Sequence, residues 1–192
     1  IRNAIVRARG VPGDFIEFGV LAGATAVVML EGALKQGKRY HGVDSFKGMG
    51  EPGPRDVDPT GACPYPKGRF ASGTQAEVKD RIAKRLLSVR GATSKAFRLW
   101  AGYVPAVLAE IQASVFSLAY VDMDHYQPTL DALRWLWPRL SVDGVVLCHD
   151  VFEGQTHLAS GAVAEFAREK SQELVTVETY PDQMMFKKVK AW

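Results

Sequence analysis

The fold of this chain is decided by the stretch Asp14-Phe15-Ile16-Glu17-Phe18-Gly19-Val20-Leu21-Ala22-Gly23-Ala24-Thr25. Its first part, residues 14–20, is mostly apolar and is predicted to be a buried strand. Gly19 and Gly23 then allow a tight turn, and residues 24–36 are predicted to form a helix that Gly37 ends. A strand, a glycine turn and a helix in this order are typical of α/β proteins.

The same alternation continues through the rest of the chain. Further strands are predicted at 39–44, 95–100, 116–122, 145–148, 174–179 and 185–189, and further helices at 74–87, 104–111, 128–137 and 158–170. Asp143–Gly144 is predicted as the turn into one strand, and Pro181–Asp182 as the link between the last two. Continuous apolar strands between helices imply a parallel sheet covered on both faces. We therefore expect an α/β fold, a doubly wound, mostly parallel seven-stranded sheet with an antiparallel edge strand.

Composition narrows the class of protein. The 192 residues suit one domain over residues 1–192, and 47% hydrophobic with 23% charged residues is the norm for globular chains. The net charge is only +3, and Lys and Arg are scattered, which argues against a nucleic-acid partner. No apolar run is long enough to span a bilayer, so no membrane partner is expected. Two cysteines cannot form a disulfide framework, which favours a cytoplasmic location.

Residues 47–73 contain no clear helix or strand and are rich in Gly and Pro. So long a loop in a compact domain is usually functional or disordered. Because it leaves the carboxyl end of a predicted strand, we expect a lid that shapes an acceptor pocket. A floppy insertion is the alternative.

The glycine turn and the next strand end predict a cofactor site. Ligands in such sheets bind at the carboxyl ends of the strands, and N–H groups at the start of the following helix can hold a carboxylate. Glu17 would accept from an ammonium group, and Asp44, 21 residues after Gly23, would bind a ribose diol. Together they indicate an adenosine with an amino-acid tail. The alternatives are a buried acid satisfied by backbone N–H groups for Glu17 and a simple turn former for Asp44.

Aromatic residues near this turn are candidates to contact the adenine. Phe46 would flank it, and an aromatic in the segment Trp100–Tyr103 would wall it, although Trp100 fits core packing equally well. The dinucleotide fingerprint G-x-G-x-x-G is absent, which argues against NAD. The residues assigned to the cofactor are Glu17, Gly19, Gly23, Thr25, Asp44, Ser45, Phe46, Trp100, Gly102 and Asp122.

The fourth and fifth strands end in Asp122, Asp124, His149 and Asp150. If these strands are neighbours, the four side chains converge, and such carboxylates repel one another unless a cation or a proton intervenes. Oxygen ligands suit Mg²⁺, whereas an imidazole shifts the preference toward Mn, Fe, Ni or Zn. A metal in this cluster would activate a bound alcohol, and a nearby Asp or His would take its proton.

Structural roles for the same residues stay open. Asp124 or Gln127 would cap the helix predicted from Pro128. His149 and Asp150 would form a structural pair, and the cluster would then hold no metal. His41 is predicted to lie in the core or on a sheet face.

Four segments, residues 17–25, 43–48, 122–133 and 138–144, resemble the macrocin O-methyltransferase family. The resemblance extends from about Gly13 to about Phe166. It implies the Rossmann-like methyltransferase fold, S-adenosyl-L-methionine as donor, and a sugar or phenolic hydroxyl of a natural product as acceptor. It also implies a Mg²⁺-supported site (or Mn²⁺), with Asp122 as ligand and Asp124 as base, and a homodimer.

In that family Asp150 matches the second of two adjacent acids, and this chain has His149 in place of the first. With the resemblance, the candidate metal ligands are Asp122, His149 and Asp150, and the candidate bases are Asp124 and His149. The sequence therefore favours an O-methyltransferase that acts on a small-molecule hydroxyl. The alternatives are a metal-dependent hydroxylase or hydrolase on the same sheet, and a non-catalytic adenosine-binding module.

Overall fold

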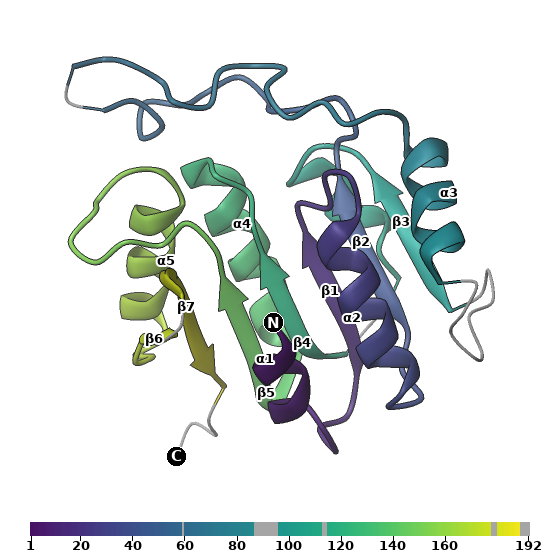
Figure 1. Cartoon of the computed structure of the whole chain (residues 1–192). Coiled ribbons are helices and arrows are strands. Elements are labelled where there is room, and N and C mark those ends of the chain that lie inside the picture. Colours follow the sequence, from purple (N-terminus) through teal and green to yellow (C-terminus); the bar gives the residue numbers. More distant parts are fainter. Residues whose placement is uncertain (59, 87–95, 113–114, 178–179, 189–192) are drawn as a thin grey trace.

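The structure is a computed structural model that describes residues 1–58, 60–86, 96–112, 115–177 and 180–188. Its centre is one seven-stranded sheet in the order β3-β2-β1-β4-β5-β7-β6 (Figure 1). Strands β1 to β5 are parallel, and β7 runs antiparallel to both β5 and β6. This confirms the predicted α/β class with its antiparallel edge. The strands are β1 Asp14–Phe18, β2 Tyr40–Asp44, β3 Phe97–Ala101, β4 Phe116–Val121, β5 Leu140–Cys148, β6 Val175–Val177 and β7 Tyr180–Lys187.

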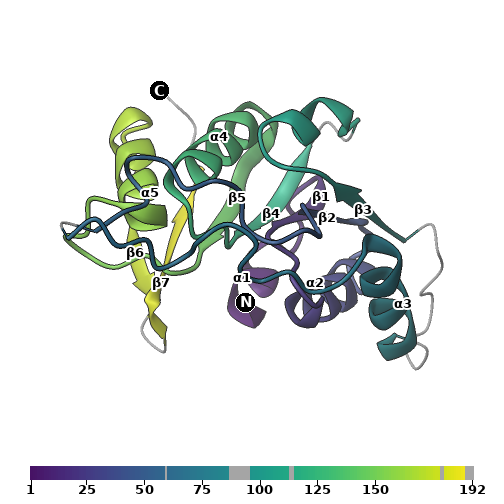
Figure 2. The same cartoon turned by 90° about the horizontal axis from the view of Figure 1, so that it is seen from above.

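Helices cover both faces of the sheet (Figure 2). They are α1 Arg2–Arg7, α2 Ala24–Leu34, α3 Gln75–Arg85, α4 Tyr126–Leu136 and α5 Leu158–Glu169, with 3₁₀ turns η1 Ala106–Glu110 and η2 Trp137–Arg139. Alternate strand residues enter opposite cores, as the two-residue period of a strand requires. Phe15 packs with α1, α2 and α3, whereas Ile16 packs with η1, α4 and α5. None of the helices in the described ranges is long and apolar enough to cross a membrane.

Two predicted turns are wrong, because both segments lie inside strands. Asp143 and Gly144 belong to β5, where Asp143 N–H donates to Lys188 O and Lys188 N–H donates to Gly144 O. These bonds to Lys188 and the pairing of Leu140 with Phe116 of β4 extend the strand back to Leu140, and a register shift against β4 accommodates the extra residues. Pro181 and Asp182 belong to β7.

Most other boundaries shift by one or two residues. Helix α4 begins at Tyr126, two residues before the predicted start at Pro128, and β1 ends at Phe18 because Gly19 has a left-handed backbone (φ 91°). Parts of four predicted elements lie outside the described residues: residue 87 of one helix, and residues 95, 178–179 and 189 of three strands.

The segment 47–73 contains no helix or strand among its described residues, as expected. It crosses above the carboxyl ends of the strands from β2, reaches the α5 side and returns to α3 (Figures 1 and 2). Backbone hydrogen bonds close its stem, from Met49 N–H to Arg69 O (2.8 Å) and from Gly68 N–H to Met49 O (2.9 Å). Its far part is tied to the start of α5, where Leu158 N–H donates to Arg55 O (2.8 Å). The segment is therefore held by backbone hydrogen bonds at its stem and at the start of α5.

Candidate active site

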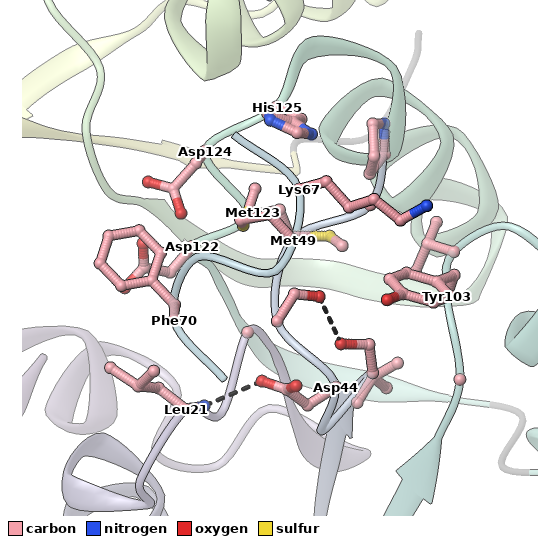
Figure 3. A pocket seen from close by; sticks show the side chains of 18 of the residues that line it. Leu21, Asp44, Met49, Lys67, Phe70, Tyr103, Asp122, Met123, Asp124 and His125 are labelled. Carbon is pink, nitrogen blue, oxygen red and sulfur yellow. Dashed lines mark hydrogen bonds between the residues drawn. The ribbon is translucent and has the colours of Figure 1, made fainter. Parts of the chain in front are cut away.

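A cavity of about 600 Å³ opens at the carboxyl ends of the parallel strands. Residues at the ends of β1, β2, β3 and β4 meet there with residues of the segment 47–73 (Figure 3). His149 and Asp150, which follow β5, also line the cavity. This is the place where ligands bind in doubly wound sheets. The residues of the predicted site that line the cavity are Gly19, Asp44, Ser45, Gly102, Asp122, Asp124, His149 and Asp150.

The two glycines of the first turn are needed for different reasons. A Cβ at Gly19 would lie 1.8 Å from the backbone oxygen of Asp122, so only glycine lets the end of β1 approach the end of β4. A Cβ at Gly23 would lie 2.7 Å from the side chain of Ile82. Gly23 therefore permits close packing of α2 against α3 and does not line the cavity.

Asp44 does more than form a turn. Its Oδ2 accepts hydrogen bonds from the N–H groups of Val20 (2.8 Å) and Leu21 (2.9 Å), and its Oδ1 accepts one from Phe46 N–H (2.7 Å). The carboxylate thus joins the turn after β1 to the turn after β2 (Figure 3). A carboxylate has about four acceptor positions, so one remains for a ligand in the cavity. Ser45 Oγ closes the next turn by donating to Gly48 O (2.7 Å).

Glu17 lies beneath the glycine turn and is fully buried. The Tyr40 hydroxyl donates to Oε2, and Oε1 has no hydrogen-bond partner among the described residues. Burial, reinforced by the charges of Asp122 and Asp44, raises the pKa of Glu17 well above its usual value. Glu17 does not line the cavity, and neither does Thr25, in the first turn of α2.

The structure does not place Phe46 or Trp100 at the cavity. Phe46 adopts a left-handed backbone (φ 54°) and its ring is buried in the core beside α2 and α3. Trp100 is also buried, stacked on His41 with its Nε1 3.4 Å from His41 Nδ1, which is the core-packing alternative. His41 lies in the core as expected, 3.2 Å from Asp14 Oδ2. The aromatic side chain of this segment that lines the cavity is Tyr103, which is 44% exposed.

The acidic residues after β4 and β5 converge on one imidazole. His149 Nδ1 lies 3.3 Å from Asp122 Oδ1 and 3.2 Å from Asp150 Oδ1. Asp124 and Asp150 both have left-handed backbones (φ 57° and 52°), a conformation that non-glycine residues adopt mainly in turns and at functional sites. The four residues predicted to meet here are therefore brought together.

This clustering raises two pKa values, which favours the neutral form of Asp124 and the charged form of His149. Burial, together with the charges of Asp122 and Asp150, raises the pKa of Asp124 to about 7. The contact with Asp122, assisted by the charges of Asp150 and Asp182, raises the pKa of His149 to about 9 although burial opposes it. At neutral pH Asp124 can therefore exchange a proton readily, which is the property of a general base or acid.

The same cluster suits a divalent cation. One ligand atom from each of Asp122, His149 and Asp150 lies within 4.8 Å of the other two. His149 Nδ1 is buried, and although oxygens of Asp122 and Asp150 lie 3.3 and 3.2 Å away, neither contact has hydrogen-bond geometry. Two carboxylates and an imidazole form a donor set that binds first-row divalent metals, so these residues fit the predicted metal.

Sequence reasoning missed Asp56, which caps α4 from the segment 47–73. Asp56 is 2% exposed, its Oδ1 accepts from Tyr126 N–H (2.6 Å), and its Oδ2 accepts from Gly53 N–H (2.7 Å). The predicted cap by Gln127 does not form, because its side chain donates to Asp131 instead. The N-cap residue is His125, and its side chain makes no capping hydrogen bond to the helix. Nothing near Asp56 in the sequence indicates this, because its partner is 70 residues away.

Comparisons with known proteins agree with this geometry. A family model described as "Methyltransferase domain" matches residues 16–151. The 8-demethyl-8-(2,3-dimethoxy-alpha-L-rhamnosyl)-tetracenomycin-C 4'-O-methyltransferase of Streptomyces olivaceus is 29% identical over 148 residues. That match covers 76% of this chain, and the chain spans 55% of the length of this curated relative.

Solved structures show the same fold. The O-methyltransferase NovP superposes with a TM-score of 0.77 at 21% identity, over 98% of this chain and 79% of its own. The calicheamicin methyltransferase CalS11, also described as a TDP-rhamnose 3'-O-methyltransferase, superposes with a TM-score of 0.76 at 23% identity, over 97% of this chain and 76% of its own.

Proposed function

We propose that this chain, which belongs to the methyltransferase-domain family, transfers the methyl group of S-adenosyl-L-methionine to a hydroxyl of a small molecule. The observation that carries this proposal is the placement of Asp124. Its partly buried carboxylate lines the same cavity as the glycine turn and Asp44. A proton acceptor and a cofactor turn that share one cavity are what O-methyl transfer requires.

The donor would occupy the side of the cavity formed by the ends of β1, β2 and β3. There Gly19 and Leu21 offer close backbone approach, Asp44 offers an acceptor to the ribose, and Tyr103 replaces Trp100 as the aromatic beside the adenine. Glu17, Gly23 and Thr25 would support this turn from beneath. The donor supplies an electrophilic methyl group on a positively charged sulfur.

Asp124 would accept the proton of the acceptor hydroxyl. As the O–H bond breaks toward the Asp124 carboxylate, the oxygen forms a bond to the methyl carbon and the carbon–sulfur bond breaks. S-adenosylhomocysteine leaves with the bonding pair on sulfur, so charge and atoms balance. His149 is the weaker candidate for the base, because its raised pKa keeps the free imidazole protonated at neutral pH. Holding the hydroxyl in line with the methyl group would supply much of the rate.

Asp122, His149 and Asp150 would hold a divalent cation near this hydroxyl. When bound, such an ion lowers the pKa of an alcohol and fixes its position. The hydroxylase and hydrolase alternatives lose support from the family match, and a non-catalytic module leaves the perturbed Asp124 without a role.

We propose a sugar hydroxyl of a natural product as the acceptor, with a phenol as the second candidate. The name of the Streptomyces olivaceus relative specifies a rhamnosyl-tetracenomycin substrate, and CalS11 is described as a TDP-rhamnose 3'-O-methyltransferase. The acceptor side of the cavity mixes charged and apolar groups, with Glu51 and Lys67 beside Met49, Phe70 and Met123. Segment 47–73 would act as the lid over this acceptor. Assembly as a homodimer and a cytoplasmic location stay predictions.

Isothermal titration calorimetry with S-adenosylhomocysteine tests the cofactor assignment. We expect micromolar binding by the wild type. Asp44→Ala should weaken it by roughly 10-fold or more. The variant loses the acceptor for the ribose, and three backbone N–H groups that hold the two turns in place lose theirs, each at about 1–3 kcal/mol of folding free energy. Asp80→Ala, on the exposed face of α3, is the control and should bind as the wild type does. If the Asp44 variant binds S-adenosylhomocysteine as tightly as the wild type, Asp44 does not belong to the cofactor site.

The reaction itself is tested by following S-adenosylhomocysteine release with rhamnosylated and phenolic acceptors. Methylation of a rhamnosyl hydroxyl is the expected result. Tight binding of S-adenosylhomocysteine without turnover of either acceptor class would favour the adenosine-binding module. Absence of binding under all conditions would contradict the proposed function.

A further inference from the structure

The two ring nitrogens of His149 face different acidic neighbours. Nδ1 lies between Asp122 and Asp150, whereas Nε2 lies 3.3 Å from Asp182 Oδ2. All four side chains are between 27% and 34% exposed. The imidazole is therefore enclosed by carboxylates on both sides and still accessible from the cavity.

Asp182 reaches this position through the antiparallel edge of the sheet. Cys148 of β5 pairs with Met184 of β7, so moving two residues past Cys148 leads back to Asp182. The Val151 N–H donates to Asp182 O (2.9 Å), which fixes the β7 backbone beside the segment that carries His149 and Asp150. The position of the Asp182 carboxylate is thus set by strand pairing.

The contact with Asp182 fixes the orientation of the imidazole ring, because a carboxylate only accepts hydrogen bonds and therefore holds an N–H at Nε2. Nδ1 then faces the space between Asp122 and Asp150. A divalent cation in that space would replace the proton on Nδ1 and bind its lone pair. Metal-binding histidines are commonly oriented by a carboxylate on their other nitrogen in this way.

We infer that Asp182 is a positioning residue that directs His149 Nδ1, with Asp122 and Asp150, onto a divalent cation, and that this site favours late first-row metals over Mg²⁺. The inference rests on the divalent cation of the proposed function and specifies which metals the site prefers. Mg²⁺ selects oxygen ligands, whereas imidazole favours ions such as Ni²⁺, Co²⁺ and Zn²⁺. One histidine in place of an acid therefore changes the metal for which the site is suited.

Calorimetric titration of the protein with Ni²⁺ and with Mg²⁺, without donor or acceptor, measures this preference. His149→Asp restores an all-oxygen set and should lower the ratio of Ni²⁺ to Mg²⁺ affinity by about 10-fold or more. Pulsed electron paramagnetic resonance of bound Mn²⁺ should detect nitrogen coupling in the wild type and lose it in this variant. An unchanged ratio, or retained nitrogen coupling, overturns the imidazole as ligand.

The role of Asp182 is tested by a graded pair of variants. Asp182→Ala should weaken Ni²⁺ binding by roughly 10- to 100-fold, and Asp182→Asn, which keeps a carbonyl acceptor, should fall between it and the wild type. Glu153→Gln, an exposed carboxylate in the loop after β5, is the matched control and should leave both affinities unchanged. Ni²⁺ affinities of the Asp182 variants equal to that of the control overturn the positioning role.

Loss of folding is recognised separately, because S-adenosylhomocysteine affinity and melting temperature are measured on every variant. If Asp182→Ala does not fold, Asp182→Asn and His149→Asp still decide the question. A protein that binds Ni²⁺ as expected but binds no S-adenosylhomocysteine contradicts the proposed function and leaves this inference standing. A protein that binds S-adenosylhomocysteine while none of the variants alters metal binding overturns this inference alone.

Discussion

Asp124→Asn is expected to lower kcat by about 100- to 10,000-fold, the range for loss of a general base, with S-adenosylhomocysteine affinity within about 2-fold of wild type. The amide is nearly isosteric with the carboxylate and cannot take the proton of the acceptor. Asp124 lies on the cavity wall among Asp122, His149 and Asp150. The measurement is steady-state methylation beside calorimetric titration of each protein.

Asp143→Asn is the matched control for this prediction. Asp143 lies in the same sheet, is 58% exposed and pairs with Lys187 on the surface, so its kcat should equal that of the wild type. Full activity of Asp124→Asn would assign the proton transfer to another group. His149 would then be the next residue to vary.

Asp56→Ala is expected to lower the free energy of unfolding by about 2–4 kcal/mol, because two backbone donors, Gly53 N–H and Tyr126 N–H, lose their acceptor. For a domain of this size that corresponds to a fall of roughly 5–15 °C in Tm. The acceptor KM should also rise, since Asp56 anchors the segment that places Lys67 and Phe70 at the cavity. Thermal unfolding and steady-state kinetics measure the two effects.

Two variants show whether the effect is specific to the cap on α4. Asp56→Asn keeps one oxygen acceptor and should lie between Asp56→Ala and the wild type. Asp58→Ala removes a carboxylate of the same segment whose hydrogen bonds within the described residues are to Thr60 and Ala62. This variant should leave Tm and the acceptor KM unchanged. A Tm of Asp56→Ala equal to that of Asp58→Ala would contradict this role of Asp56.

The sequence by itself determined the α/β class, the glycine turn and the meeting of Asp122, Asp124, His149 and Asp150. These features follow from local rules. Apolar strands alternate with helices at short range, and parallel strands bring their carboxyl ends to one edge of the sheet. Because each candidate residue directly follows a strand, the order of elements alone places them together.

Only the tertiary structure decided which side chains face the cavity and which residues support them. Phe46 and Trp100 enter the core, and Tyr103 lines the cavity, since the backbone direction after each strand depends on packing against the helices. Asp56 caps α4 across 70 residues, and Asp182 reaches His149 through pairing of β7 with β5. Contacts at such separations have no local signature, because they are selected by the burial and hydrogen bonding of the assembled sheet.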